Sequence, residues 1–222
     1  MEVIEDKAVL LAVPEHLTPQ ITEHIEQSEV ISTRDGLSEL LVYWGIDEML
    51  TLNKLVKLKE NLPSPMARDY SWPGMFTPFD HQRVTAEFLS INHRAFCFNE
   101  AGTGKTSSVL WAADYLMSLG KIKKVLVICP LSIMYSAWQD DVFNTCMHRT
   151  SQVCHGSADK RKKIIQGDWD FTIINYDGIG IVKDEIIASN FDLIVVDECN
   201  AYKTHTTARW KALFKILGGK EK

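Results

Sequence analysis

The sequence lacks several features that would narrow its class at once. No apolar run approaches the ~18 residues of a membrane-spanning helix, so we expect no membrane partner. The N-terminus, Met1 to Asp6, is acidic and lacks the basic segment that begins a secretory signal peptide. Internal repeats and low-complexity tracts are also absent from the sequence. These absences favour an intracellular protein, cytoplasmic or located in a nucleoid or nucleus.

Cysteine is scarce and scattered. The five cysteines include no C-x-x-C pair, so a zinc site is not expected. Three of them lie in or beside apolar runs that read as strands. We expect buried free thiols in a reducing compartment.

The composition is that of a globular chain, with 45% hydrophobic and 24% charged residues. The net charge of −5 argues weakly against a nucleic-acid partner. The acidic excess is confined to the front of the chain, since residues 1–65 hold 5 basic and 12 acidic residues, whereas residues 66–222 hold 19 and 17. A local basic groove therefore remains possible in the second part.

Residues 99–106, Asn-Glu-Ala-Gly-Thr-Gly-Lys-Thr, form the most informative stretch. They lie between the apolar run Ala95–Phe98, expected to be a strand, and a helical pattern over residues 105–119. A strand, a glycine-rich turn and a helix N-terminus make a phosphate cradle, because backbone N–H groups and the positive helix end face the anion. Asn99 stands where the P-loop pattern has its first glycine. Taken alone, the stretch leaves open a chance glycine turn at a helix start.

Each residue of this loop suits a nucleotide. Gly102 and Gly104, on either side of Thr103, let the backbone turn without a Cβ clash. Lys105 is expected to reach the β- and γ-phosphates and to act in catalysis, and the Thr106 hydroxyl is expected to ligate Mg²⁺. The predicted cofactors are therefore ATP and Mg²⁺.

A second element supports this interpretation. Residues 191–198 form an apolar strand that ends in two carboxylates, at the edge where ligands bind in open parallel sheets. Such a strand is expected to be buried on both faces. Asp197 is predicted to hold the Mg²⁺ shell, and Glu198 to orient or deprotonate the attacking water. An Asp-Glu pair alone is more often a solvated strand end, but the pair and the phosphate loop together indicate an ATPase.

The front of the chain, residues 1–65, reads as a small acidic α/β accessory module. Its expected elements are a strand over 8–13, a helix over 18–26 with Thr18 as N-cap, a turn at Asp35-Gly36, a strand over 39–45 and a helix over 46–60. Proline- and glycine-containing segments at 61–65 and 72–74 separate this module from the rest.

Strands and helices alternate along the remainder of the chain, residues 66–222. The expected strands are 95–98, 124–129, 151–155, 171–175 and 193–196. The expected helices are 105–119, 135–147, 159–166, 178–188 and 206–217. This alternation predicts an α/β fold with a mostly parallel sheet and helices on both faces.

The ordered motifs over roughly residues 76–217 resemble the first RecA-like lobe of superfamily 2 helicases. Residues 79–82, Phe-Asp-His-Gln, stand where that family keeps its adenine-reading glutamine. The Gln82 amide can donate to adenine N7 and accept from the N6 amine at once. The alternative is a surface glutamine at a helix start.

Within that superfamily, the chain is most similar to the Swi/Snf-type DNA translocases. Residues 127–138 resemble that group's Cys-Pro-x-Ser … Trp segment, residues 171–177 its strand ending in a polar-Tyr pair, and residues 197–203 its Asp-Glu-Ala-His-x-x-Lys motif. The resemblance implies double-stranded DNA as partner and a second RecA-like lobe in cis. It also implies Ser132, Asn175 and Tyr176 as nucleic-acid contacts, which position a strand without reading its sequence.

The sequence departs from this group in three places. Asn99 replaces an acidic residue that is common in the group, Asn200 replaces the histidine of the acidic motif, and no Thr-Gly-Thr-Pro-like motif precedes Lys222. The second lobe with its arginine fingers would then be missing, so the 222 residues read as a fragment, with a naturally short protein as the alternative. We expect them to be nearly inactive alone, because an arginine finger is worth ~10³–10⁵ in rate.

Other features have two interpretations each. Trp138 lies near a DNA backbone or in the core. The basic run over residues 160–163 is a solvated helix face or a phosphate-tracking patch. The motifs and the resemblance together imply that the chain contains the ATP-binding lobe of a DNA-dependent ATPase that translocates on or remodels duplex DNA. The alternatives are a non-hydrolysing nucleotide-dependent binding module and an RNA helicase lobe.

Overall fold

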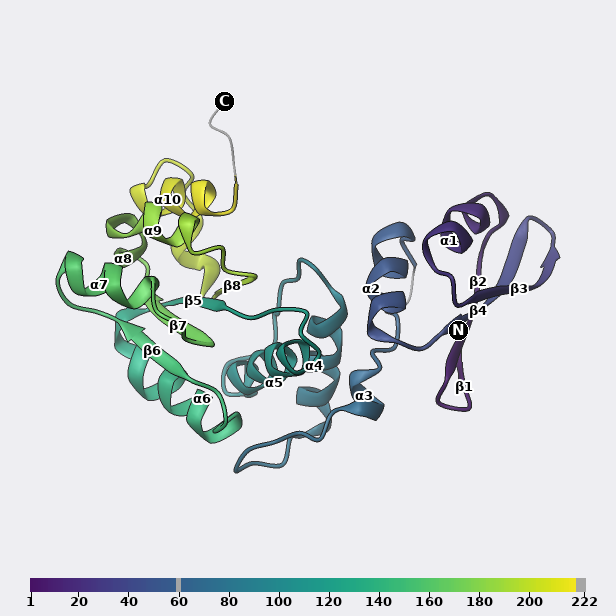
Figure 1. The fold of residues 1–222 in the computed structure, drawn as a ribbon, viewed down its shortest axis with the longest axis horizontal. Coiled ribbons are helices and arrows are strands. Elements are labelled where there is room, and N and C mark those ends of the chain that lie inside the picture. The colour runs from purple at the N-terminus through teal and green to yellow at the C-terminus, as the bar shows by residue number, and fades with distance from the viewer. Residues whose placement is uncertain (59–60, 219–222) are drawn as a thin grey trace. The chain divides into compact units, whose positions relative to one another are not determined.

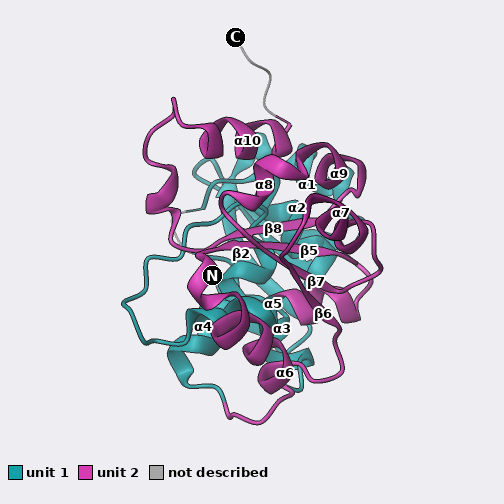
Figure 2. Cartoon of the chain, turned by 90° about the vertical axis from the view of Figure 1, so that its left-hand side faces the viewer, with its two compact units in different colours: residues 1–72, 78–112 teal, residues 73–77, 113–222 magenta. Residues whose placement is uncertain are grey.

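The computed structural model describes residues 1–58 and 61–218 (Figure 1). They form two compact units, one of residues 1–72 with 78–112 and the other of residues 73–77 with the chain from Ala113 onward (Figure 2). The predicted domain division after residue 65 remains a prediction. Within the part of the chain that the structure describes, no helix is long and apolar enough to cross a membrane.

The first unit begins with a four-stranded antiparallel sheet in the order β1-β2-β4-β3. Its strands are β1 Glu2–Ile4, β2 Ala8–Pro14, β3 Ser28–Arg34 and β4 Leu37–Tyr43. Alternate residues of β2, Val9, Leu11 and Val13, are buried, as expected for a sheet with one covered face. Asp35 and Gly36 both have positive φ, which suits the tight turn predicted there.

Helices complete this unit. They are α1 Thr18–His24, α2 Ile46–Leu55, α3 Met66–Asp69, α4 Asp80–Ile91 and the start of α5 Lys105–Ser118.

Two expectations for the front of the chain were wrong, and strands β1 and β3 were not predicted. Thr18 is the first helical residue and not the N-cap, because the 3₁₀ turn η1, Glu15–Leu17, runs directly into α1. The strand β3 was missed, since it is an edge strand with mostly exposed, polar side chains. Helix α2 ends at Leu55, where Val56 turns extended. The last two positions predicted for it, 59 and 60, lie outside the described residues.

The second unit contains a four-stranded parallel sheet in the order β6-β7-β5-β8, which confirms the predicted α/β fold. Its strands are β5 Val125–Cys129, β6 Ser151–Cys154, β7 Phe171–Asn175 and β8 Leu193–Val196. The helical segments are η2 Leu131–Ile133, the π-helical turn η3 Met134–Gln139, α6 Asp140–Thr145, α7 Ala158–Ile165, α8 Gly178–Ile181, α9 Lys183–Ala188, η4 Cys199–Tyr202 and α10 Ala208–Ile216.

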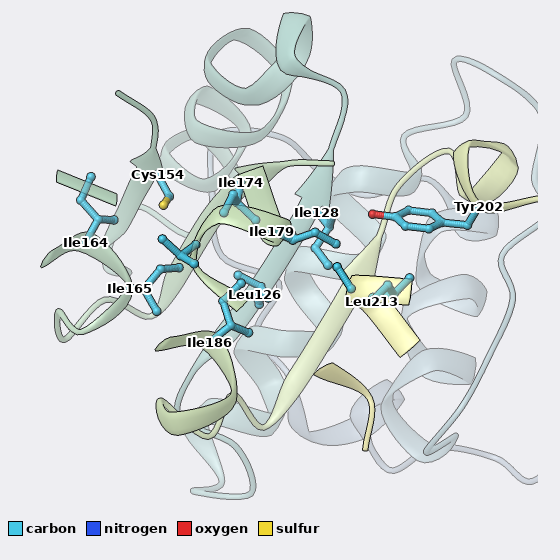
Figure 3. Close-up of a cluster of buried hydrophobic side chains, with 12 residues drawn as sticks. Leu126, Ile128, Cys154, Ile164, Ile165, Ile174, Ile179, Ile186, Tyr202 and Leu213 are labelled. Carbon is cyan, nitrogen blue, oxygen red and sulfur yellow. The ribbon is translucent and has the colours of Figure 1, made fainter. Parts of the chain in front are cut away.

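One apolar cluster packs α7, α8, α9 and α10 against the sheet (Figure 3). Leu126 and Ile128 of β5 and Ile174 of β7 are fully buried there. The helix predicted over residues 178–188 is broken into α8 and α9 at Val182, whose backbone is not helical.

The strand predicted at Ala95–Phe98 is not formed in the structure. Phe96 and Phe98 are 74% and 82% exposed and stack on each other, with ring centroids 5.6 Å apart. Strand residues are stabilised by ladder hydrogen bonds to a neighbour, and these four residues have no strand partner among the described residues.

The prediction that β8 is buried on both faces was also wrong. All four of its residues are half-buried, because β8 is the edge strand of its sheet and pairs with β5 on one side.

We predict that Ile174→Ala lowers the free energy of unfolding by about 2–5 kcal/mol, because it removes a fully buried side chain from the cluster. Urea denaturation measures the change. Ile181→Ala is the matched control, since Ile181 is 51% exposed on α8 and its truncation should cost less than about 0.5 kcal/mol. Equal losses for the two variants would contradict this account of the core.

Candidate nucleotide-binding site

The glycine-rich loop has the backbone that a phosphate cradle requires. Gly102 and Gly104 have φ of +79° and +72°, in the left-handed region that favours glycine. A Cβ at Gly104 would lie 1.9 Å from Nε2 of Gln82, whereas a Cβ at Gly102 would meet no atom within 4 Å. Both glycines are thus required by conformation, and a side chain at Gly104 would in addition displace the Gln82 amide.

The positively charged side chain of the loop, Lys105, lies at the start of α5. The Lys105 ammonium donates to the carbonyl oxygens of Asn99 and Glu100, at 2.9 and 2.8 Å, and the Thr103 hydroxyl donates to Glu100 O at 2.8 Å. Thr106 follows in the first turn of this 14-residue helix. Free N–H groups at a helix start, a lysine and left-handed glycines together suit a phosphate group.

Gln82 supports this loop from α4. Its Oε1 accepts from the Phe79 N–H at 2.9 Å, and its Nε2 donates to Thr103 O at 3.3 Å. Both ends of the side-chain amide therefore contact backbone, and adenine recognition by Gln82 remains a prediction.

Two further side chains join α4 to the loop. The Asn99 side chain donates to the Thr85 hydroxyl at 2.9 Å, which gives the residue at the missing glycine position a structural role. The His81 ring nitrogen Nε2 lies 3.0 Å from Thr103 O. Sequence reasoning overlooked His81, although it directly precedes Gln82.

The acidic pair follows β8 in the second unit. The Asp197 N–H still bonds Ile128 O of β5, at 2.9 Å, so the strand register places Asp197. Its carboxylate accepts from the Trp138 indole N–H at Oδ2, 3.0 Å, and from the Glu198 N–H at Oδ1, 2.9 Å. Glu198 itself is exposed and has φ of +48°, which is uncommon outside glycine.

Tyr176, at the end of β7, holds the backbone of this pair. Its hydroxyl donates to Asp197 O at 2.6 Å and lies 3.4 Å from Glu198 O. Burial and then the Asp197 and Glu198 carboxylates raise the pKa of the Tyr176 hydroxyl above its ordinary value, so it stays a donor at neutral pH. Burial, with a smaller effect of Asp197, likewise raises the pKa of Cys129 to about 12 and keeps it a thiol.

The three predicted nucleic-acid residues differ in their surroundings. Ser132 is exposed on η2. Asn175 accepts a hydrogen bond from Arg161, and Tyr176 is bonded to the acidic pair. Trp138 is 2% exposed, so its core interpretation holds.

The basic run over residues 160–163 is not one uniform face. Arg161 is 6% exposed and donates to Gly156 O at 3.0 Å and Cys154 O at 2.8 Å, as well as to Asn175 Oδ1 at 3.2 Å. Lys162 pairs with Glu185 at 2.8 Å, and only Lys160 and Lys163 of this run are exposed.

A sequence profile of the family described as "Type III restriction enzyme, res subunit" matches residues 76–218. This segment contains the glycine-rich loop and the acidic pair. The N-terminal antiparallel sheet lies outside it.

Two curated relatives are similar to the chain. One is the "Uncharacterized ATP-dependent helicase YqhH" of Bacillus subtilis (strain 168), 21% identical over 146 residues that cover 64% of this chain and 25% of that protein. The other is the "SWI/SNF-related matrix-associated actin-dependent regulator of chromatin subfamily A containing DEAD/H box 1 homolog" of Caenorhabditis elegans, 25% identical over 158 residues, 65% of this chain and 16% of that protein. The chain thus spans a quarter or less of these relatives.

Among solved structures, the chain is similar to the SWI2/SNF2 ATPase core of Sulfolobus solfataricus in complex with dsDNA. The TM-score is 0.57 at 21% identity, over 64% of this chain and 30% of the other. This likeness confirms the predicted RecA-like fold.

We predict that Arg161→Met destabilises the protein by about 1–3 kcal/mol, because it leaves the buried Cys154 carbonyl oxygen and the partly buried Gly156 carbonyl oxygen without this donor. Chemical denaturation measures the loss. Lys163→Met, which removes an exposed charge from the same helix, should change stability by less than about 0.5 kcal/mol. If Arg161→Met kept the wild-type stability but bound DNA more weakly, the phosphate-tracking interpretation would be favoured instead.

Proposed function

Because the chain belongs to the family of the type III restriction enzyme res subunit, we propose that it is the ATP-binding lobe of a DNA-dependent ATPase that translocates on or remodels duplex DNA. Its fold is the first RecA-like lobe of a superfamily 2 helicase, close to the Swi/Snf group. The observation that carries the proposal is the left-handed Gly102–Gly104 turn leading into Lys105 at a helix start.

In this proposal the backbone of residues 102–106 and the Lys105 ammonium bind the phosphates, and Gln82 contacts the adenine. Thr106 and Asp197 would hold Mg²⁺, and the bound ion would supply positive charge that neutralises the phosphate oxygens. Glu198 orients the attacking water and accepts its proton. Its exposed carboxylate suits this role, because among the described residues no salt bridge pairs it with a cation.

Double-stranded DNA is the proposed partner. The named complex of the Sulfolobus protein with dsDNA supports it, and the exposed Ser132 with its neighbouring backbone N–H groups suits a phosphate contact. A second RecA-like lobe in cis belongs to the same proposal. Stimulation of ATP hydrolysis by duplex DNA but not by RNA, in a chain with both lobes, separates this function from an RNA helicase.

The phosphate-binding role of Lys105 is tested by Lys105→Ala. We expect the variant to fold normally and to lose nucleotide binding. Mg-ATP at one hundred times Kd should stabilise the wild-type protein by ~2.7 kcal/mol, measured as a shift in thermal unfolding, and should not shift the variant. Lys54→Ala, at an exposed lysine of α2, should keep the full shift. If Mg-ATP shifted the thermal unfolding of Lys105→Ala as much as that of the wild type, Lys105 would not be the phosphate-binding residue.

The two carboxylates are predicted to have different roles in a chain that turns over. Glu198→Gln keeps the size and hydrogen bonding but loses the base, so it should bind ATP like the wild type and lose ~10²–10⁴-fold in turnover. Asp197→Asn should weaken Mg-ATP affinity instead. Nucleotide titration with and without Mg²⁺, beside single-turnover hydrolysis, measures both. Wild-type hydrolysis by Glu198→Gln would favour the non-hydrolysing binding module.

A further inference from the structure

We infer that Trp138 and Tyr176 are positioning residues that orient the Asp197–Glu198 pair, Trp138 through the Asp197 carboxylate and Tyr176 through the backbone of the pair. The inference rests on the proposed function of the acidic pair. It assigns to both aromatic side chains a role other than core packing or nucleic-acid contact.

The Trp138 contact is specific. The side chain is 2% exposed, so an indole N–H without a partner there would be costly, and the Asp197 Oδ2 at 3.0 Å is that partner. Trp138 lies in the π-helical turn η3, after which the Asp140 N–H bonds Tyr135 O five residues back. Such turns are rare and occur frequently at functional sites.

The Tyr176 contact restrains the backbone. Its hydroxyl bonds Asp197 O at 2.6 Å, next to Glu198 with its left-handed backbone. A non-glycine residue keeps this conformation only when its surroundings hold it. The Tyr176 ring is itself fixed by an edge contact with Tyr202, with centroids 5.5 Å apart, and by the Arg209 guanidinium 5.8 Å from its centre.

Together the two contacts leave a defined part of Asp197 for a ligand. A carboxylate has about four lone-pair sites, and the Trp138 indole and the Glu198 N–H occupy one on each oxygen. The remaining sites point in directions that these two donors set. Carboxylates that bind metals are commonly oriented by such outer hydrogen bonds.

The test compares ATP affinity with Mg²⁺ and with a chelator in the purified 222-residue protein. Trp138→Phe keeps an aromatic ring and removes the N–H, and we expect the gain in affinity that Mg²⁺ provides to fall by about 10- to 100-fold. Tyr176→Phe should lower the same gain in affinity. If Trp138→Phe does not fold, Tyr176→Phe alone provides the affinity test.

The chain offers matched controls for both variants. The Trp169 indole N–H and the Tyr202 hydroxyl are buried but have no hydrogen-bond partner among the described residues. Trp169→Phe and Tyr202→Phe therefore remove the same groups without removing a contact. Both should keep the wild-type gain from Mg²⁺.

A ligand-free measurement completes the test. Asp197→Ala should shift the indole proton resonance of Trp138 and leave that of Trp169 in place, and Trp138→Phe should have no further effect on Mg²⁺-linked binding in that background. The inference would be overturned if Mg²⁺ raised the ATP affinity of Trp138→Phe and Tyr176→Phe as much as that of the wild type. It would also be overturned if the Trp138 indole resonance did not move in Asp197→Ala. If wild-type protein gains nothing from Mg²⁺, the proposed function fails, while the resonance still tests the contact.

Discussion

The pairing of β5 with both β7 and β8 is the constraint on which the second unit depends. The strand is buried along its whole length, and its register aligns Cys129 with Asn175 and Ile128 with Val196. Because parallel strands end at the same edge, Pro130, Tyr176 and Asp197 all leave the sheet there. The contacts of Trp138 and Tyr176 with the acidic pair follow from this register.

The sequence predicted most of this sheet, and the failures have a common cause. The strands 171–175 and 193–196 were located correctly because continuous runs of β-branched and aromatic residues mark them. The run Ala95–Phe98 is also apolar and contains two aromatic residues, but in the part of the chain that the structure describes it has no strand partner. Composition reports how well a residue suits a strand, whereas pairing depends on segments distant in the chain.

The sequence predicted which residue types form the candidate site but not the contacts that they make. The glycines, the lysine and the paired carboxylates can be recognised from their spacing, because nucleotide chemistry requires those residues in that order. The burial of Arg161 and its hydrogen bonds to two carbonyl groups could not be predicted from a run of four basic residues. The Trp138 contact could not be predicted either, because a tryptophan in an apolar segment is expected in the core and the sequence does not reveal the partner of its indole N–H.

The contacts within the glycine-rich loop also determine how much affinity its residues can contribute to nucleotide binding. The Lys105 ammonium already bonds two carbonyl oxygens, and both ends of the Gln82 amide are occupied. A nucleotide would therefore replace existing contacts, and each residue contributes only the difference between its old and new partners. For Lys105 that difference is favourable, because a charge-assisted bond to a phosphate is stronger than one to a carbonyl. For Gln82 the exchange is between neutral partners, so its gain in affinity should be small and its main effect is on loop geometry.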